Sequence, residues 1–97
     1  MTITEFQKLI EETYLKRDSA RGVGGTFMWF VEEVGELATA LREKDRENLE
    51  GEFADVFAWL VSLASIEGVD MERAVRNKYA GGCPRCKSSP CHCSDKS

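Results

Sequence analysis

The chain has 97 residues, of which 42% are hydrophobic and 31% are charged, and its net charge is −4. These values are typical of one globular domain, and the acidic balance excludes a general nucleic-acid binder, whose footprint would be basic. No apolar run approaches the roughly 20 residues of a membrane span, and the charged, amphipathic N-terminus is unlike a signal peptide. We therefore expect a cytoplasmic protein that binds neither membranes nor nucleic acid.

The first third of the chain predicts a helix followed by a loop. Apolar residues recur at helical spacing from about residue 4 to residue 16, and Thr4 followed by Gln7 resembles a capping box. The three glycines that follow within residues 17–25 predict a flexible loop. Basic residues flank this loop and are candidates for phosphate binding, although single surface charges more often only balance an acidic protein. They are Lys16, Arg17 and Arg21.

The remainder predicts three more helices and no strand. Thr26 is a candidate cap for a helix over residues 27–44, and a further helix over residues 46–67 should stop at Gly68. Asp70 should cap a fourth, shorter helix that ends before the glycine pair at residues 81 and 82. The sequence thus predicts an all-α domain.

The second and third predicted helices carry two apolar-bearing faces each. The main stripes consist of Phe27, Phe30, Val31, Val34, Leu37, Ala38 and Leu41 on one helix, and Leu49, Phe53, Val56, Phe57, Leu60 and Ala64 on the other. Two such faces indicate more than one packing neighbour per helix, which so short a chain can hardly supply by itself. We therefore expect a homodimer or homotetramer that shares a helical bundle.

Paired carboxylates lie beside these stripes. Glu33 and Glu36 are three residues apart on one predicted helix, and Glu52 and Asp55 repeat the spacing on the next. Residues at this spacing share one side of a helix, one turn apart. Carboxylate pairs often only solvate a helix, but here tryptophans share the same face. Converging carboxylates favour a hard divalent cation such as Mg²⁺, which prefers oxygen ligands.

The segments EEVGELATAL and EFADVFAWL resemble the all-α nucleotide pyrophosphohydrolases of the MazG-like superfamily, whose hallmark is EExxE followed after a gap by ExxD. The acidic positions that match this hallmark are Glu32, Glu33, Glu36, Glu52 and Asp55. The similarity extends over about residues 6–79. The superfamily also includes dCTP pyrophosphatases, dimeric dUTPases and phosphoribosyl-ATP pyrophosphohydrolases, so the motif leaves the substrate open.

The resemblance implies an oligomeric four-helix bundle that hydrolyses nucleoside triphosphates to monophosphate and pyrophosphate, as nucleotide-pool house-cleaning. By position, Glu33, Glu36, Glu52 and Asp55 would bind Mg²⁺. A carboxylate not fully used by the metal, Glu33 or Glu36, could accept the proton of the attacking water. Glu32 points away from the others on a helical wheel and would have a lesser role. The alternatives are phosphoribosyl-ATP hydrolysis and a non-catalytic metal-binding interaction module.

Further candidates for substrate binding are Asn77, Lys78 and the two tryptophans. Asn77 and Lys78 resemble a late polar motif of the superfamily that faces the nucleotide. Trp29, like Trp59, could stack on a base, although a large aromatic residue at helical spacing more often packs in a core or interface.

The last fifteen residues differ in composition from the rest, so we expect a domain over residues 1–82 and a cysteine-rich tail over residues 83–97. All of the cysteines lie in this tail, at positions Cys83, Cys86, Cys91 and Cys93. Clustered cysteines in a cytoplasmic chain favour a metal, and four thiolates suit a structural Zn²⁺. The short spacer between the two cysteine pairs leaves two alternatives, which are local disulfides and a redox-active tail.

Overall fold

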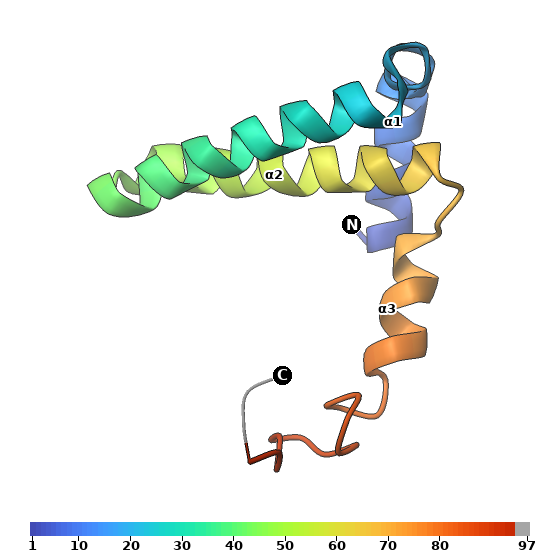
Figure 1. The fold of residues 1–97 in the computed structure, drawn as a ribbon, viewed down its shortest axis with the longest axis vertical. Coiled ribbons are helices and arrows are strands. Elements are labelled where there is room, and N and C mark those ends of the chain that lie inside the picture. The colour runs from blue at the N-terminus through green and yellow to red at the C-terminus, as the bar shows by residue number, and fades with distance from the viewer. Residues whose placement is uncertain (95–97) are drawn as a thin grey trace.

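The computed structural model describes residues 1–94, which form helices and loops without a strand. The helices are α1 (Ile3–Glu43), α2 (Arg46–Ile66) and α3 (Met71–Tyr79), as Figure 1 shows. The prediction of an all-α chain is confirmed. Within the described part of the chain, no helix is both long and apolar enough to cross a membrane. The end of the expected tail, residues 95–97, lies outside the described residues.

Helix α1 consists of two legs that meet at a sharp bend. The backbone of Gly22 has φ 89° and ψ 166°, a conformation that essentially only glycine adopts without strain. The residues on both sides of Gly22 are helical, so the N-terminal leg spans residues 3–21 and the C-terminal leg spans residues 23–43. The prediction of a flexible loop over residues 17–25 was therefore wrong except at this bend.

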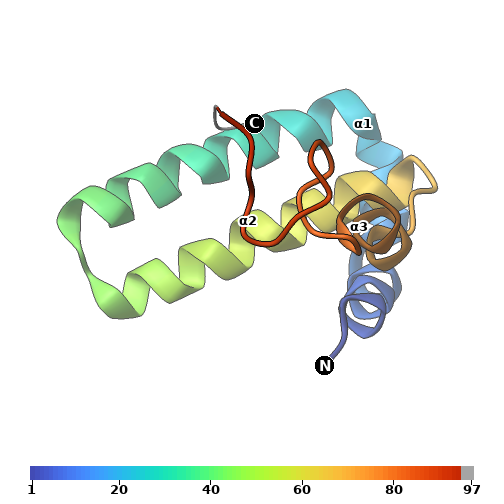
Figure 2. The same ribbon diagram turned by 90° about the horizontal axis from the view of Figure 1, so that it is seen from below.

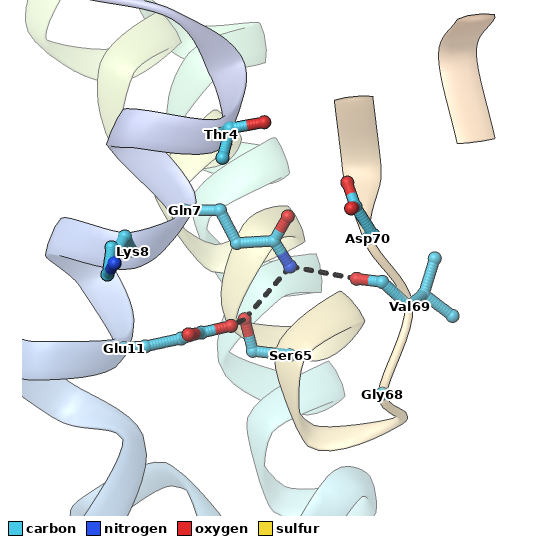
Figure 3. A pocket seen from close by; sticks show the side chains of 8 residues that line it. All are labelled: Thr4, Gln7, Lys8, Glu11, Ser65, Gly68, Val69 and Asp70. Carbon is cyan, nitrogen blue, oxygen red and sulfur yellow. Dashed lines mark hydrogen bonds between the residues drawn. The ribbon is translucent and has the colours of Figure 1, made fainter. Parts of the chain in front are cut away.

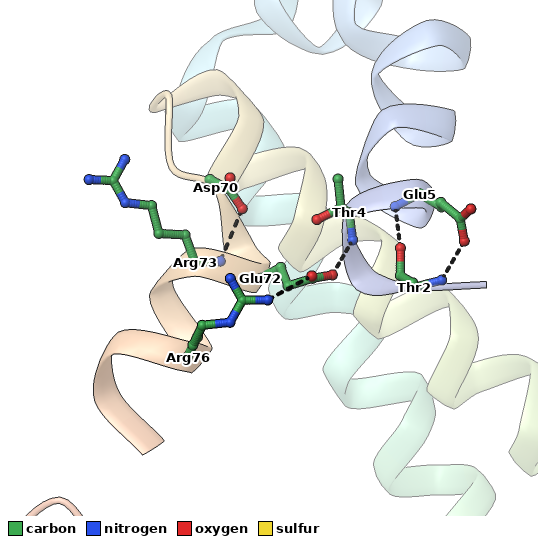
Figure 4. Close-up of polar contacts among 7 residues, drawn as sticks. All are labelled: Thr2, Thr4, Glu5, Asp70, Glu72, Arg73 and Arg76. Atoms are coloured by element: carbon green, nitrogen blue, oxygen red, sulfur yellow. Dashed lines mark hydrogen bonds and ion pairs between the residues drawn. The ribbon is translucent and has the colours of Figure 1, made fainter. Parts of the chain in front are cut away.

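The N-terminal leg begins earlier than its sequence pattern suggested. Thr2 is the cap: its hydroxyl accepts a bond from the Glu5 N–H at 3.0 Å, and Glu5 accepts one from the Thr2 N–H at 2.7 Å (Figure 4). The expected pair, Thr4 and Gln7, has other partners. The Thr4 N–H donates to Glu72 on α3, and Gln7 is buried and bonds to the α2–α3 connection.

Thr26 is not a helix cap, contrary to the sequence prediction. It is fully buried inside the bend of α1, where its hydroxyl lies 3.5 Å from the carbonyl oxygen of Asp18. The guanidinium of Arg21 donates both to Thr26, at 3.3 Å, and to the carboxylate of Asp18, at 2.9 Å. The two contacts of Thr26 join the legs, and the Asp18–Arg21 pair within the N-terminal leg positions Arg21 for one of them.

The later helix boundaries agree with the prediction. Asp45 caps α2 by accepting from the Asn48 N–H, and Asp70 caps α3 by accepting from the Arg73 N–H at 3.1 Å. Gly68 follows the end of α2 with φ 72°, the left-handed conformation that terminates helices.

The C-terminal leg of α1 runs antiparallel to α2. The N-terminal leg crosses this pair at the end opposite the α1–α2 turn (Figures 1 and 2). Phe6 on the N-terminal leg stacks on Phe57 of α2, with ring centroids 5.4 Å apart. Helix α3 then leads away from the pair. Among the described residues, the buried apolar side chains are Ile10, Ala40, Val61 and Ala64.

The main apolar stripes remain largely uncovered within one chain. Half-exposed members include Phe27, Val31, Val34, Leu41, Phe53, Phe57 and Leu60. The chain exposes 7169 Å², whereas a compact monomer of this mass exposes about 5,600 Å². Its radius of gyration is 15.6 Å, against about 12.5 Å for a compact domain of this length. One chain therefore forms an open helical framework rather than a closed core.

Candidate active site

Three of the four carboxylates predicted from the two helices meet between the C-terminal leg of α1 and α2, and Asp55 is outside this group. One carboxylate oxygen from each of Glu33, Glu36 and Glu52 lies within 4.8 Å of the others. Asp55 is one turn beyond Glu52, and its charge reaches both Glu33 and Glu52. The antiparallel pairing of the helices brings the two i, i+3 pairs together. We call these four residues the acidic centre.

The acidic centre is electrostatically strained. Partial burial, followed by the charges of Glu36, Asp55 and Glu52, raises the pKa of Glu33 above its ordinary value of 4.5. The pKa of Glu52 is raised as well, first by desolvation and then by the charges of Glu36 and Asp55. Bringing carboxylates together therefore makes each harder to ionise unless a cation joins them.

Two oxygen atoms show where such a cation fits. Oε2 of Glu33 and Oε1 of Glu52 are buried and have no hydrogen-bond partner among residues 1–94. A buried carboxylate oxygen without a donor costs free energy, and such atoms are rare in folded proteins. A hard divalent cation would satisfy both atoms and neutralise the surrounding charge. The all-oxygen ligand set suits Mg²⁺, so the residues present fit the metal that the sequence implied.

An aromatic cleft of about 370 Å³ adjoins the acidic centre. Trp29 and Trp59 stack across it from α1 and α2, with ring centroids 6.1 Å apart and ring planes 12° from parallel. The guanidinium of Arg21 lies over the Trp59 ring, 5.2 Å from its centroid. Asp55 belongs both to this cleft and to the acidic centre. The other lining residues are Tyr14, Arg17, Asp18, Ala58 and Ser62.

One member of this cleft was missed by sequence reasoning. Asp18 lay in the segment expected to be a loop, yet it is 3% exposed and pairs with Arg21 at 2.9 Å. The i, i+3 spacing of Asp18 and Arg21 was the available signal, since such pairs stabilise a helix rather than a loop. Arg17 and Arg21, which were candidates for phosphate binding, line the cleft, whereas Lys16 is exposed outside its lining.

The predicted substrate residues on α3 stand apart from the acidic centre. Asn77 and Lys78 are exposed, and the ammonium of Lys78 lies 5.8 Å from the ring centroid of Tyr79. Helix α3 is attached to the start of α1, where Glu72 accepts from the Thr4 N–H at 2.9 Å (Figure 4), and its far end leads away from α2 (Figure 1). The role of Asn77 and Lys78 in substrate binding stays a prediction.

A second hollow, of about 320 Å³, lies where the N-terminal leg meets the α2–α3 connection (Figure 3). Gln7 donates there to Ser65 at 3.0 Å and to the Val69 carbonyl at 2.8 Å, and Ser65 donates to Glu11 at 2.8 Å. The carbonyl oxygen of the Gln7 side chain accepts from the Met71 N–H. Because these polar groups already satisfy one another, we interpret the hollow as a structural joint.

Paired carboxylates on two antiparallel helices lie next to a cleft that carries aromatic and arginine side chains, an arrangement that suits a hard cation beside an anionic, ring-containing ligand. Residues 24–87 match the model of the MazG nucleotide pyrophosphohydrolase domain. The chain therefore belongs to this family. The match confirms both the resemblance drawn from the acidic motif and the expected enzyme class, nucleotide pyrophosphohydrolase.

Three curated relatives are similar over most of this chain. A dATP/dGTP diphosphohydrolase of Cyanophage S-2L is 35% identical over 79 residues, which are 81% of this chain and 71% of the relative. A dATP/dGTP diphosphohydrolase of Salmonella phage PMBT28 is 36% identical over 79 residues, 81% of this chain but 26% of that protein. The histidine biosynthesis bifunctional protein HisIE of Helicobacter hepaticus is 34% identical over 67 residues, 69% of this chain and 29% of that protein. The chain thus spans less than a third of two of these relatives.

Proposed function

We propose that the protein is a Mg²⁺-dependent hydrolase that cleaves nucleoside triphosphates to monophosphate and pyrophosphate. The observation that carries the proposal is the pair of buried, unpartnered oxygens of Glu33 and Glu52 on facing helices. Mg²⁺, when bound, neutralises phosphate charge and lowers the pKa of bound water. We place this activity in the cytoplasm, as removal of surplus or unwanted nucleotides.

The acidic residues divide the work in this proposal. Glu33, Glu36, Glu52 and Asp55 hold the cation, and either Glu33 or Glu36 takes the proton of the attacking water. Glu36 is the more exposed of the two and is open to water. Glu32 is exposed and contributes only a minor repulsion to Glu33, which suits a supporting role.

The aromatic cleft is the proposed site for the base. Trp29 is 48% exposed although its ring stacks on Trp59, so part of its surface is free to contact a further ring. Arg21 and Arg17 add positive charge beside the cleft. The two phage relatives are named for dATP and dGTP, so we propose purine deoxynucleoside triphosphates as the first substrates to test.

The test is pyrophosphate release from a panel of purine and pyrimidine nucleoside triphosphates, in both the ribose and the deoxyribose forms. Each reaction is run with Mg²⁺ and with EDTA, and the nucleotide product is identified. We expect monophosphate and pyrophosphate with Mg²⁺ only. Glu52→Gln should be inactive, whereas Glu47→Gln, an exposed change on the same helix, should be active. Release of orthophosphate instead would place the cleavage at another bond and overturn the proposal.

Phosphoribosyl-ATP is the second candidate substrate, and the similarity to the HisIE protein is the observation that favours it. Hydrolysis of phosphoribosyl-ATP would use the same metal and cleave the same kind of bond. The difference is the substrate that the aromatic cleft has to bind. Adding it to the panel separates the two substrates by their relative kcat/KM. If folded protein turns over neither class, a non-catalytic metal-binding module becomes the better description.

We also propose that the protein is a homodimer or homotetramer. The chain exposes about 1,600 Å² more than a compact monomer would. If each of two chains buried this excess, the interface would total about 3,200 Å², which is within the range of obligate dimers. The uncovered stripes lie on the α1–α2 pair, so two such pairs would complete a four-helix bundle. The Phe53 side chain is 53% exposed in the single chain, so Phe53→Glu should place a charge in the interface and dissociate the assembly. Light scattering measures the mass that results. Val75→Glu, on α3, is the matched control and should keep the mass of the wild-type assembly. A wild-type protein with the mass of one chain, 10.9 kDa, would refute the proposal.

A further inference from the structure

The tail after α3 folds into a compact loop around its cysteines. The Cys83 N–H donates to the Ser88 carbonyl at 2.9 Å, and the Lys87 N–H donates to the Cys83 carbonyl at 2.7 Å. Gly82 has φ 92°, and a Cβ at this position would lie 2.7 Å from the Ser88 carbonyl oxygen. The loop therefore closes tightly on its own backbone, where only glycine fits.

The four sulfur atoms converge on one point. All of them lie within 4.8 Å of one another. The measured Sγ–Sγ distances are 3.6 Å for Cys91 and Cys83, 3.8 Å for Cys83 and Cys93, and 3.9 Å for Cys86 and Cys91. Sulfurs bound to a tetrahedral zinc at about 2.3 Å lie about 3.8 Å apart, whereas a disulfide joins its sulfurs at about 2.05 Å. The cysteines are free, and their spacing is that of ligands around a common centre.

Backbone N–H groups point at these sulfurs. The His92 N–H donates to Sγ of Cys86 at 3.2 Å, and the Cys93 N–H donates to Sγ of Cys91 at 3.3 Å. Such bonds stabilise a thiolate, which is the form that binds a metal. His92 is exposed, and its ring does not belong to the group of converging ligands. The donor set is therefore four sulfurs rather than three sulfurs and an imidazole.

The composition of the loop removes the usual source of stability. Residues 83–94 include no Val, Leu, Ile, Met, Phe, Tyr or Trp, so the loop has no large apolar side chain to bury. A segment of this length does not fold by burial alone, and a metal cross-link supplies the missing free energy in small domains. We propose that the tail holds one Zn²⁺ in a closed, structural site with four thiolate ligands. The ligands are Cys83, Cys86, Cys91 and Cys93.

The site is independent of the proposed hydrolase activity. All four positions of a tetrahedral ion are filled by protein, so no position is left for water or substrate. The ligands also differ in kind, because soft thiolates select zinc whereas the carboxylates of the acidic centre select a hard cation. The zinc would fix the tail directly after α3, where the Gly82 N–H donates to the Tyr79 carbonyl at 3.0 Å.

The test is elemental analysis of the full chain, purified under reducing conditions without chelator and then reconstituted with zinc. We expect about one zinc per chain, and cobalt substitution should give the absorption bands of a tetrahedral thiolate complex. Cys86→Ser and Cys91→Ser should each lower the zinc content by at least about tenfold at limiting free zinc. Helical circular dichroism of these variants shows whether the main domain is still folded.

Two control variants sharpen the result. His92→Ala should keep its zinc, since the imidazole is outside the donor set, and Glu52→Gln should keep it as well, even where hydrolysis is lost. No zinc binding by reduced protein would overturn the proposal, as would iron in its place or two disulfides in reducing buffer. Loss of zinc in His92→Ala would overturn the assignment of four sulfur ligands.

Discussion

The acidic centre and the cysteine tail are two clusters of negatively charged or ionisable ligands held in different ways. The acidic centre stands on helices of 41 and 21 residues that pack on each other and on the N-terminal leg of α1. The tail stands on a loop without large apolar side chains, held by hydrogen bonds among its own backbone and sulfur atoms. In the acidic centre, the packed helices position the ligands. In the tail, the loop depends on its ligands and a bound metal for a stable fold.

This difference sets what each metal does. A cation at the acidic centre relieves strain in a structure that already exists, so its loss should remove activity and leave the helices in place. A cation in the tail is coupled to folding of that segment, because the unfolded loop has no preformed site. The two sites should therefore respond to metal removal in different observables, which are activity for the acidic centre and local unfolding for the cysteine tail.

The largest expected effect is on catalysis. Glu52→Gln removes one carboxylate from the acidic centre, and we expect kcat/KM for triphosphate hydrolysis to fall by about 10²–10⁴-fold. Circular dichroism should show unchanged helix, because removing a charge relieves repulsion with Glu36 and Asp55. Glu32→Gln, on the exposed side of α1, should lower kcat/KM by less than about tenfold. Equal losses in the two variants would mean that the cluster does not hold the reacting groups.

Chelation should separate the two regions. With metal removed, trypsin should cut after Arg85 or Lys87 at least about tenfold faster, because the tail loses its cross-link and opens locally. The helices should stay folded at the assay temperature, although their thermal midpoint should fall, because the acidic centre loses the cation that relieves its repulsion. Mass spectrometry of the fragments, read alongside circular dichroism, makes the comparison. Cys83→Ser without chelator should reproduce the rapid cleavage, and a chelator that melts the helices would contradict the contrast.

The bend of α1 tests whether the helical framework is what positions the first site. Gly22→Ala forces a side chain into a conformation that glycine alone tolerates, and should lower the free energy of unfolding by about 1–3 kcal/mol. Gly24→Ala is the matched control, since Gly24 has no positive φ and a Cβ there meets no atom within 4 Å. Urea denaturation should show that control to be neutral or stabilised by up to about 1 kcal/mol.

The smallest effect is on pH dependence without metal. The folded-state pKa values of Glu33 and Glu52 are raised above 4.5, so the folded chain holds protons that the unfolded chain has lost. Stability should therefore fall as the pH rises from 4.5 through the raised values. Urea midpoints measured in EDTA across this range should show the slope, and Glu52→Gln should flatten it. A slope of the opposite sign would contradict the repulsion.

Glu72 provides an internal contrast for that experiment. Its pKa is lowered, first by the N–H of Thr4, so its contribution is present above 4.5 and is lost as the pH falls through the lowered value. The stability that the Glu72–Thr4 bond contributes is therefore lost below pH 4.5, whereas the stability change from the acidic centre occurs above pH 4.5. Glu72→Gln should remove the acid-side loss and leave the other slope unchanged.

The sequence by itself determined the helical class, the cap at Asp70, the stop at Gly68, and the candidate ligands. Asp45 was not singled out, but the predicted start of its helix at residue 46 agrees with it. These features are local: a cap or a left-handed glycine acts within one turn, and i, i+3 carboxylates share a face wherever the helix is placed. For the same reason the cysteine spacing was readable without a structure.

Only the tertiary structure decided how these parts meet. The conformation around Gly22 depends on Thr26, which contacts Asp18 and Arg21 across the bend, and a count of glycines cannot show such contacts. The true start of α1 was hidden because Gln7 is used by the α2–α3 connection rather than by a cap. The burial of oxygens on Glu33 and Glu52 likewise arises from the helix pairing. Burial and long-range hydrogen bonds are properties of the assembled helices, so no local pattern could specify them.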